Sequence, residues 1–233
     1  MDNFVYDIGT KIYFGKGQIE NLGAEVKAYG DEALLVYGGG SIKKTGIYDK
    51  AMESLKKAGV STVELAGVEP NPRVTSVREG VRLCRENGVQ VVLPIGGGSS
   101  IDCAKVIAGS VSYEGDPWDL VVGKAKYKSF LPIVSVLTLA ATGSEMDAVA
   151  VISNMDTNDK LGTGHPDMRP KASILDPTYT FTVSKYQTAS GTADIMSHIM
   201  ENYFGGSEGA YLQDRMAEGL LKTCIKYGVV AVR

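Results

Sequence analysis

The sequence predicts an α/β domain built on a parallel sheet, followed by the beginning of an all-helical domain. Two observations predict this: apolar strand runs alternate with amphipathic helices up to residue 177, and only helix signals follow residue 184. We place the boundary near residue 178, giving an α/β domain over 1–178 and a partial helical domain over 179–233. A helical piece of about 55 residues buries little surface of its own, so it is not expected to be stable alone.

Strand–helix–strand units make up the first part. The predicted strands span 33–37, 60–65 and 89–95, and the predicted helices span 45–58, 74–86 and 99–111. Such crossovers are the units of parallel sheets. The nearly continuous apolar character of 89–95 is typical of a strand that is covered on both faces.

The later elements are read in the same way. Asp116 followed by Pro117 predicts a helix start, with aspartate as the N-cap and proline at the first helical position. Further strands are expected at 132–137 and, from weaker signals, at 148–153 and 172–175; helices are expected at 186–204 and 210–227.

Composition excludes several classes of function. A net charge of -3 provides no basic surface for nucleic acid, and no apolar run approaches the ~20 residues that cross a membrane. The opening Met-Asp-Asn-Phe lacks the basic and apolar parts of a secretory signal. Cys84, Cys103 and Cys224 are odd in number and far apart, which predicts reduced thiols in a cytoplasmic protein.

Two Gly-Gly-Gly-Ser runs, at 38–41 and 96–99, stand where a strand hands over to a helix. Glycine lets a ligand approach the backbone, and a helix N-terminus offers unpaired N–H groups to a phosphate. Neither run has the GxGxxG spacing, and the alternative is two tight turns without a ligand. We take them as a dinucleotide site, with the candidate residues Gly38, Gly39, Ser41, Gly96, Gly97, Gly98 and Ser99.

The first glycine run also bears on the form of the cofactor. NAD sites often place a carboxylate near this strand end to bind the ribose 2′-hydroxyl. Here the run continues with Ser41, Lys43 and Lys44 and contains no acid. Hydroxyl and ammonium groups suit a 2′-phosphate, so we expect NADP(H) rather than NAD(H).

Asp194 and His198 are four residues apart in a predicted helix and therefore lie on one face. A carboxylate and a neutral imidazole suit Zn²⁺ or Fe²⁺, while the alternative is a simple Asp–His hydrogen bond within the helix. His165 lies in a loop rich in glycine and proline and is not expected to be a ligand.

Taken together, these motifs resemble the iron-containing (group III) alcohol dehydrogenases. Residues 96–105, GGGSSIDCAK, resemble the GGGSxxDxAK signature, 138–146 match the TxxxTGSE segment, and 193–198 resemble the first half of the metal motif. The run at 38–46 is most similar to the NADPH-dependent butanol dehydrogenase and aldehyde reductase branch.

The resemblance implies a dehydroquinate-synthase-like dinucleotide domain followed by a helical domain that binds Fe²⁺ or Zn²⁺. It implies NADP-linked interconversion of primary alcohols and aldehydes, of the butanol and butyraldehyde kind, with no catalytic residue apart from the metal site. Carried over by motif, Gly96 to Ser99 would hold the pyrophosphate, while Asp194 and His198 would bind the metal. Further cofactor residues implied by motif are Asp102, Thr138, Thr142 and Lys160.

The sequence departs from the family in two places. Asp147 stands where this branch usually has asparagine, and the chain ends before the two further histidine ligands, so we expect a truncated protein. The alternatives are a non-catalytic dinucleotide-binding fragment and a polyol dehydrogenase of the glycerol type. An apolar helix face without a partner would favour self-association or a homo-oligomer; its residues are Tyr211, Leu212, Met216, Leu220 and Leu221.

Overall fold

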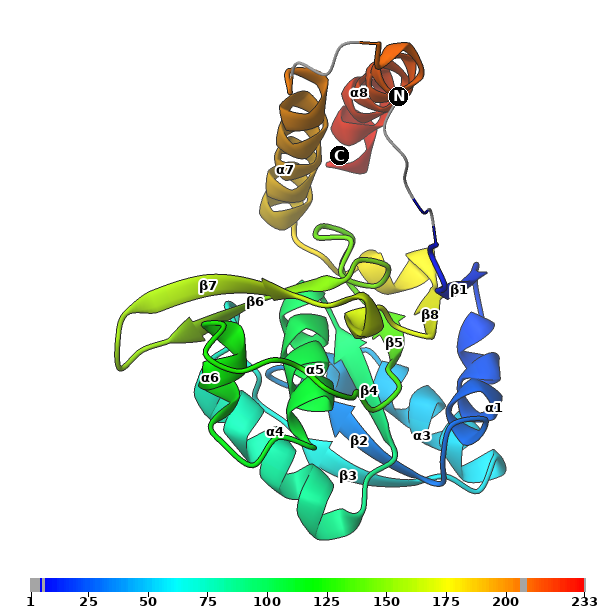
Figure 1. The fold of residues 1–233 in the computed structure, drawn as a ribbon. Helices are drawn as coiled ribbons and strands as arrows, with labels where there is room; N and C mark the ends of the chain where they lie inside the picture. The colour runs from blue at the N-terminus through cyan, green and yellow to red at the C-terminus, as the bar shows by residue number, and fades with distance from the viewer. Residues whose placement is uncertain (1–4, 6, 206–208, 233) are drawn as a thin grey trace. The chain divides into compact units, whose positions relative to one another are not determined.

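The computed structural model describes residue 5 and residues 7–205 and 209–232. Its centre is a parallel six-stranded sheet with the strand order β1-β8-β5-β4-β2-β3 (Figure 1). The strands are β1 (Lys11–Phe14), β2 (Glu32–Val36), β3 (Ser61–Leu65), β4 (Val91–Gly96), β5 (Val134–Leu137) and β8 (Ala172–Leu175). The α/β class and the parallel sheet expected from the sequence are therefore confirmed.

Helices cover both faces of this sheet (Figure 1). One face carries α4 (Val74–Asn87), α5 (Gly98–Ser110) and α6 (Pro117–Val121); the other carries η1 (Gln18–Asn21), α1 (Leu22–Lys27) and α3 (Ile47–Lys57), and the short α2 (Ser41–Lys44) follows β2. The alternation of a strand divides its side chains between two cores. Leu34 packs with the α4–α5 layer and Leu35 with the α1–α3 layer.

A second, antiparallel sheet extends from this body. It is the hairpin of β6 (Val149–Asn154) and β7 (Asp159–Gly164), and β6 lies against α5. The expected strand at 148–153 thus exists, but it joins the hairpin and not the parallel sheet. Short 3-10 turns, η2 (Pro166–Met168) and η3 (Pro177–Thr180), follow β7 and β8.

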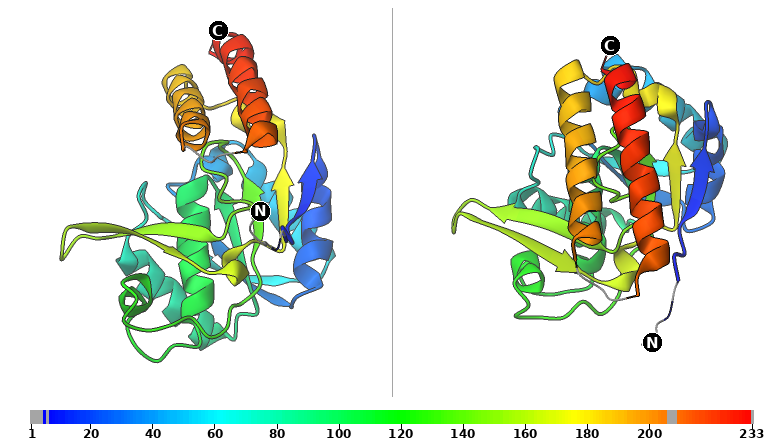
Figure 2. Two further views of the ribbon diagram at one scale, coloured as in Figure 1. Left: turned by 45° about the horizontal axis from the view of Figure 1, so that its top comes forward. Right: turned by 90° about the horizontal axis from the view of Figure 1, so that it is seen from above.

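The chain divides into two compact units. One comprises residues 1–139 and 143–179, and the other comprises 140–142 and 180–233. The second unit holds α7 (Lys185–Tyr203) and α8 (Tyr211–Ala231), which run side by side in Figure 2. Ser184 caps α7 by accepting a 3.2 Å hydrogen bond from the Gln187 N–H. None of the described helices is long and apolar enough to cross a membrane.

Candidate nucleotide-binding and metal sites

The turn at 96–99 is built for close approach of the backbone to another group. β4 ends at Gly96, and α5 begins at Gly98 without a side-chain cap on its first turn in the described part of the chain. A Cβ at Gly96 would lie 2.5 Å from Ser100 Oγ, and one at Gly97 would lie 3.3 Å from Leu139 Cβ. The uncapped N–H groups of a 13-residue helix fit a pyrophosphate, because they supply donors and a positive dipole end.

The other residues predicted for the cofactor have different positions. The Thr138 N–H donates a 3.0 Å hydrogen bond to the Gly96 carbonyl, which places Thr138 beside the 96–99 turn. Lys160 lies on the exposed strand β7, opposite Ser153 of β6. Thr142 belongs to the helical unit.

The turn at 38–41 follows β2 and includes a backbone conformation that only glycine adopts freely. Gly40 has a φ of 91°, in the left-handed region, and Ser41 begins the short helix α2. The Gly38 carbonyl accepts a 3.1 Å hydrogen bond from the Gly67 N–H, so the segment after β3 packs against this turn. The two glycine turns therefore lie after neighbouring strands, β2 and β4, at the same edge of the sheet.

Lys43, one of the residues expected to meet a 2′-phosphate, has protein partners. Its Nζ lies 3.4 Å from Glu64 Oε2 and sits over the rings of Tyr37 and Tyr48. We call Tyr37, Lys43, Tyr48 and Glu64 the Lys43 cluster. Glu64 comes from β3, so the carboxylate that the sequence lacks near β2 is supplied by the next strand.

Asp102 faces protein groups with both of its carboxylate oxygens. Oδ1 accepts a 2.6 Å hydrogen bond from Ser144 Oγ, and Oδ2 accepts a 2.9 Å bond from the Val151 N–H. Burial raises the pKa of this carboxyl despite both bonds. Asp102 therefore connects α5 to the TGSE segment and to β6, and any contact with a cofactor remains a prediction.

Asp147 is the counter-charge of a buried lysine. Lys105 is fully buried in α5, and its Nζ donates to Asp147 Oδ1 at 2.6 Å and to the Val149 carbonyl at 2.8 Å. Burial lowers the pKa of Lys105, although Asp147 favours its charged form. Asp147 thus has a structural role as the partner of Lys105, the last residue of the 96–105 motif, to which the sequence assigned no partner.

Asp194 and His198 lie on one face of α7, as their spacing predicts. Asp194 Oδ2 and His198 Nε2 are 3.8 Å apart, and both side chains are exposed. Two ligands of one tetrahedral ion at ~2.1 Å are about 3.4 Å apart, so a small rotation of either side chain suits a metal. Among the described residues, no group of three His, Cys, Asp or Glu side chains is placed to hold an ion. His165 instead stacks on Phe130, with ring centres 4.8 Å apart.

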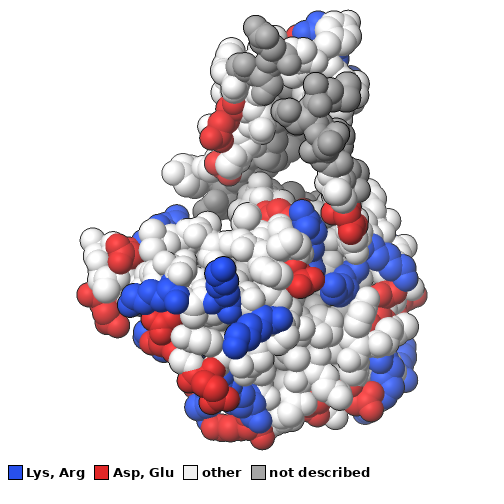
Figure 3. Space-filling model, in the orientation of Figure 1, with Lys and Arg blue, Asp and Glu red and all other residues white. Residues whose placement is uncertain are grey.

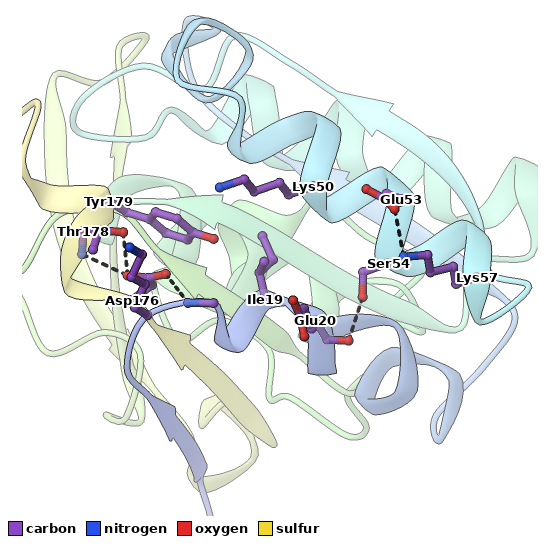
Figure 4. A pocket seen from close by; sticks show the side chains of 11 residues that line it. Ile19, Glu20, Lys50, Glu53, Ser54, Lys57, Asp176, Thr178 and Tyr179 are labelled. Atoms are coloured by element: carbon purple, nitrogen blue, oxygen red, sulfur yellow. Dashed lines mark hydrogen bonds and ion pairs between the residues drawn. The ribbon is translucent and has the colours of Figure 1, made fainter.

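A separate cavity of about 450 Å³ lies among η1, α3 and η3 (Figure 4). The Tyr179 hydroxyl points into it near Lys50, and this buried oxygen has no hydrogen-bond partner within the described part of the chain. Burial raises the pKa of Tyr179 to about 12, which keeps the phenol neutral. Three segments that are far apart in the sequence form this cavity, so no local sequence motif predicts it.

The visible face of the α/β unit mixes both signs of charge. In Figure 3, lysine and arginine are interspersed with aspartate and glutamate. On this face there is no broad basic patch of the kind that binds nucleic acid.

Comparison with known proteins agrees with these motifs. The sequence profile of the family described as "Iron-containing alcohol dehydrogenase" matches residues 9–177. The chain belongs to the iron-containing alcohol dehydrogenases. This confirms the family expected from the motifs at 96–105 and 138–146, and it implies a nucleotide cofactor and an iron-type metal.

Individual relatives cover the whole chain. It is 65% identical over 232 residues to NADH-dependent butanol dehydrogenase B of Clostridium acetobutylicum, with all of this chain and 60% of the relative covered. It is 41% identical to the NADPH-dependent aldehyde reductase YqhD of Escherichia coli, with 100% and 60% covered. The crystal structure of NADH-dependent butanol dehydrogenase A from Thermotoga maritima superposes with a TM-score of 0.94 at 46% identity, covering 98% of this chain and 57% of that one. The chain thus spans about three fifths of the length of these relatives.

Proposed function

We propose that this chain supplies the dinucleotide site and the first two metal ligands of an enzyme that interconverts primary alcohols and aldehydes. The observation that carries the proposal is the uncapped α5 N-terminus behind Gly96 and Gly97, at the edge where β2 and β4 both end in glycine turns. Such an edge is where open α/β sheets bind nucleotides. The family and the names of the relatives support butanol and butyraldehyde as the substrate class.

The residues of this chain would divide the work by position. Backbone N–H groups at the start of α5 would bind the pyrophosphate and so orient the nicotinamide end. Asp194 and His198 would hold the metal, which when bound supplies Lewis acidity at the carbonyl oxygen. The Asp102–Ser144 and Lys105–Asp147 contacts hold residues 144–147 on α5.

We propose NADP(H) as the preferred carrier, because Ser41 and Lys44 bring a hydroxyl and an ammonium group to the β2 end of the site, where the ammonium group of Lys43 is paired with Glu64. The printed names of the relatives divide on this point, since butanol dehydrogenase B is NADH-dependent and YqhD is NADPH-dependent. Titration calorimetry with each carrier tests the proposal. A smaller Kd for NADPH supports it, and a smaller Kd for NADH overturns it.

A second candidate function is dinucleotide binding without turnover. It is favoured by the metal pair, because catalytic metal sites normally have three protein ligands and the described residues gather only two. In this second function the chain binds the nucleotide but does not catalyse the reaction.

One experiment separates the two functions. Purified protein is analysed for Fe and Zn, titrated with NADPH, and assayed for butyraldehyde reduction. Stoichiometric metal together with turnover supports the alcohol dehydrogenase, whereas NADPH binding with neither supports the binding protein. Absence of NADPH and NADH binding would overturn both. Variants Asp194→Ala and His198→Ala serve as controls, since both should lose metal and keep NADPH binding.

We further propose that the exposed apolar residues of α8 mediate association with another copy of the chain. Tyr211, Leu212, Met216 and Leu220 are all more than half exposed in the single chain. A cytoplasmic location remains a prediction from the cysteines, which are free in the structure.

A further inference from the structure

The Lys43 cluster forms a compact polar group at the edge where β2 and β3 end. Glu64 Oε2 accepts a 2.5 Å hydrogen bond from the Tyr37 hydroxyl, and Oε1 accepts one from the Tyr48 hydroxyl. The Lys43 Nζ lies 4.5 Å from the centre of the Tyr48 ring and 5.1 Å from that of Tyr37. The ammonium group is therefore held by two aromatic rings and one carboxylate.

The charges of this cluster are fixed at neutral pH. Partial burial alone would raise the pKa of the Glu64 carboxyl, but hydrogen bonds from Tyr37, Tyr48 and Lys43 bring it below its ordinary value. The pKa of Lys43 is raised by its contacts with Tyr37 and Glu64. Glu64 is thus ionised and Lys43 protonated, so Lys43 brings no uncompensated positive charge to the 38–41 turn.

The cluster lies beside that turn through the pairing of two strands. Glu64 is opposite Leu35 in the register of β2 and β3, and the Gly67 N–H binds the Gly38 carbonyl. The segment 38–46 contains no acid, yet Glu64 of the neighbouring strand lies 3.4 Å from the ammonium group of Lys43 in that segment. A carboxylate there can accept a hydrogen bond from a ribose 2′-hydroxyl, but it repels a 2′-phosphate.

We propose that Glu64 is a specificity-determining residue that weakens the binding of a 2′-phosphorylated dinucleotide relative to the unphosphorylated one. The inference rests on the proposed nucleotide site and holds whichever carrier the wild-type chain prefers. A 2′-phosphate gains Lys43 only by drawing its ammonium away from Glu64. Lys43 therefore favours the 2′-phosphorylated dinucleotide and Glu64 disfavours it. The measured preference between NADPH and NADH is the sum of these two opposing effects.

The test compares the Kd values of NADPH and NADH for the wild-type chain and Glu64→Gln, measured by titration calorimetry. Glutamine has the same shape; its Oε1 can accept a hydrogen bond from one of the two tyrosine hydroxyls, and its Nε2–H can donate to the other hydroxyl oxygen, so mainly the charge is lost. We expect the ratio of Kd for NADH to Kd for NADPH to rise roughly tenfold, chiefly because NADPH binds more tightly. Lys43→Met removes the opposing charge, and in this variant the ratio should fall.

Glu86→Gln is the matched control. Glu86 is an exposed acid in the last turn of α4, where it pairs with Arg82. This end of α4 precedes the start of β4, away from the strand ends that carry the glycine turns. It loses the same charge, and its ratio should equal that of the wild type. Should Glu64→Gln bind both carriers with the wild-type ratio, the inference is overturned while the proposed nucleotide site stands. Should the wild-type chain bind neither carrier, the proposed function falls and the inference with it.

Discussion

The α/β unit and the helical pair differ in how far their apolar side chains are buried. Leu93 in β4 is fully buried, whereas Leu220 in α8 is 53% exposed. No described residue of α7 is buried, and in α8 only Ala217 is. Two helices of 19 and 21 residues thus form although only Ala217 among their described residues is buried. The comparison teaches that a regular helix is weak evidence for a self-sufficient domain, because helices draw most of their stability from packing.

The largest expected effect comes from matched truncations in the two regions. Leu93→Ala should lower the free energy of unfolding by about 3 kcal/mol, because it leaves a cavity between packed layers. Leu220→Ala should change it by less than about 0.5 kcal/mol. Urea unfolding followed by the fluorescence of Trp118, the single tryptophan, reports on the α/β unit. Equal losses of unfolding free energy in the two variants would contradict the difference in burial between the two regions.

The next effect concerns the ion pair between Lys105 of α5 and Asp147, which follows the TGSE segment. Asp147→Ala should cost about 2 kcal/mol, because it leaves the buried ammonium of Lys105 without its partner while Asp147 itself is partly exposed. Asp147→Asn is the control, since an amide oxygen can still accept the hydrogen bond and should restore part of the loss. The same urea titration measures both. Wild-type stability of the alanine variant would show that Lys105 is satisfied without Asp147.

The third effect concerns self-association through the exposed apolar side chains of α8. Light scattering at increasing concentration should show dimers or larger species for the wild-type chain. The double variant Leu212→Glu and Leu220→Glu should shift them toward the monomer, because both side chains are exposed in the single chain. Met155→Glu, at an exposed position beyond β6 of the α/β unit, is the control and should leave the association unchanged. A wild-type chain that stays monomeric throughout would refute the proposal.

The smallest effect is a pH dependence of the Lys43 cluster. The folded-state pKa of Glu64 is lowered, so its contribution to stability is present above the ordinary glutamate pKa and is lost as the pH falls through the lowered value. Because Glu64 is about one third exposed, the contribution is about 0.5 kcal/mol. The difference in unfolding free energy between wild type and Glu64→Gln should therefore be constant near neutral pH and shrink as the pH falls below the ordinary glutamate pKa. A difference that grows as the pH falls through that range would argue against the lowered pKa.

Local patterns predicted most of the central sheet. The apolar run at 89–95 became β4, and Asp116 does cap α6 by accepting a 2.9 Å hydrogen bond from the Trp118 N–H. The strand at residues 11–14 was not predicted. β1 is a short edge strand whose side chains are exposed or half-buried, so its sequence lacks the apolar run of a buried strand. The exposed strand β7 has no apolar alternation, since its place is set by pairing with β6.

The candidate sites were predictable where they depend on contiguous motifs. The glycine turns and the Asp194–His198 pair are local, and the structure places each at the strand end or helix face that its motif indicated. The role of Glu64 and the pairing of Lys105 were not predicted, because their partners are far along the chain, at Lys43 and Asp147. Only the pairing of β2 with β3 and the packing of α5 against β6 bring these charges together.

Hydrogen–deuterium exchange with and without NADPH tests most directly the claim that the α/β unit holds the nucleotide at its glycine turns. The account predicts slower exchange of the amides of Gly97, Gly98 and Ser99 on addition of NADPH, together with the 38–41 turn. The amides of α8 should exchange at an unchanged rate. Unchanged exchange in both turns at saturating NADPH, or protection confined to α8, would contradict the account.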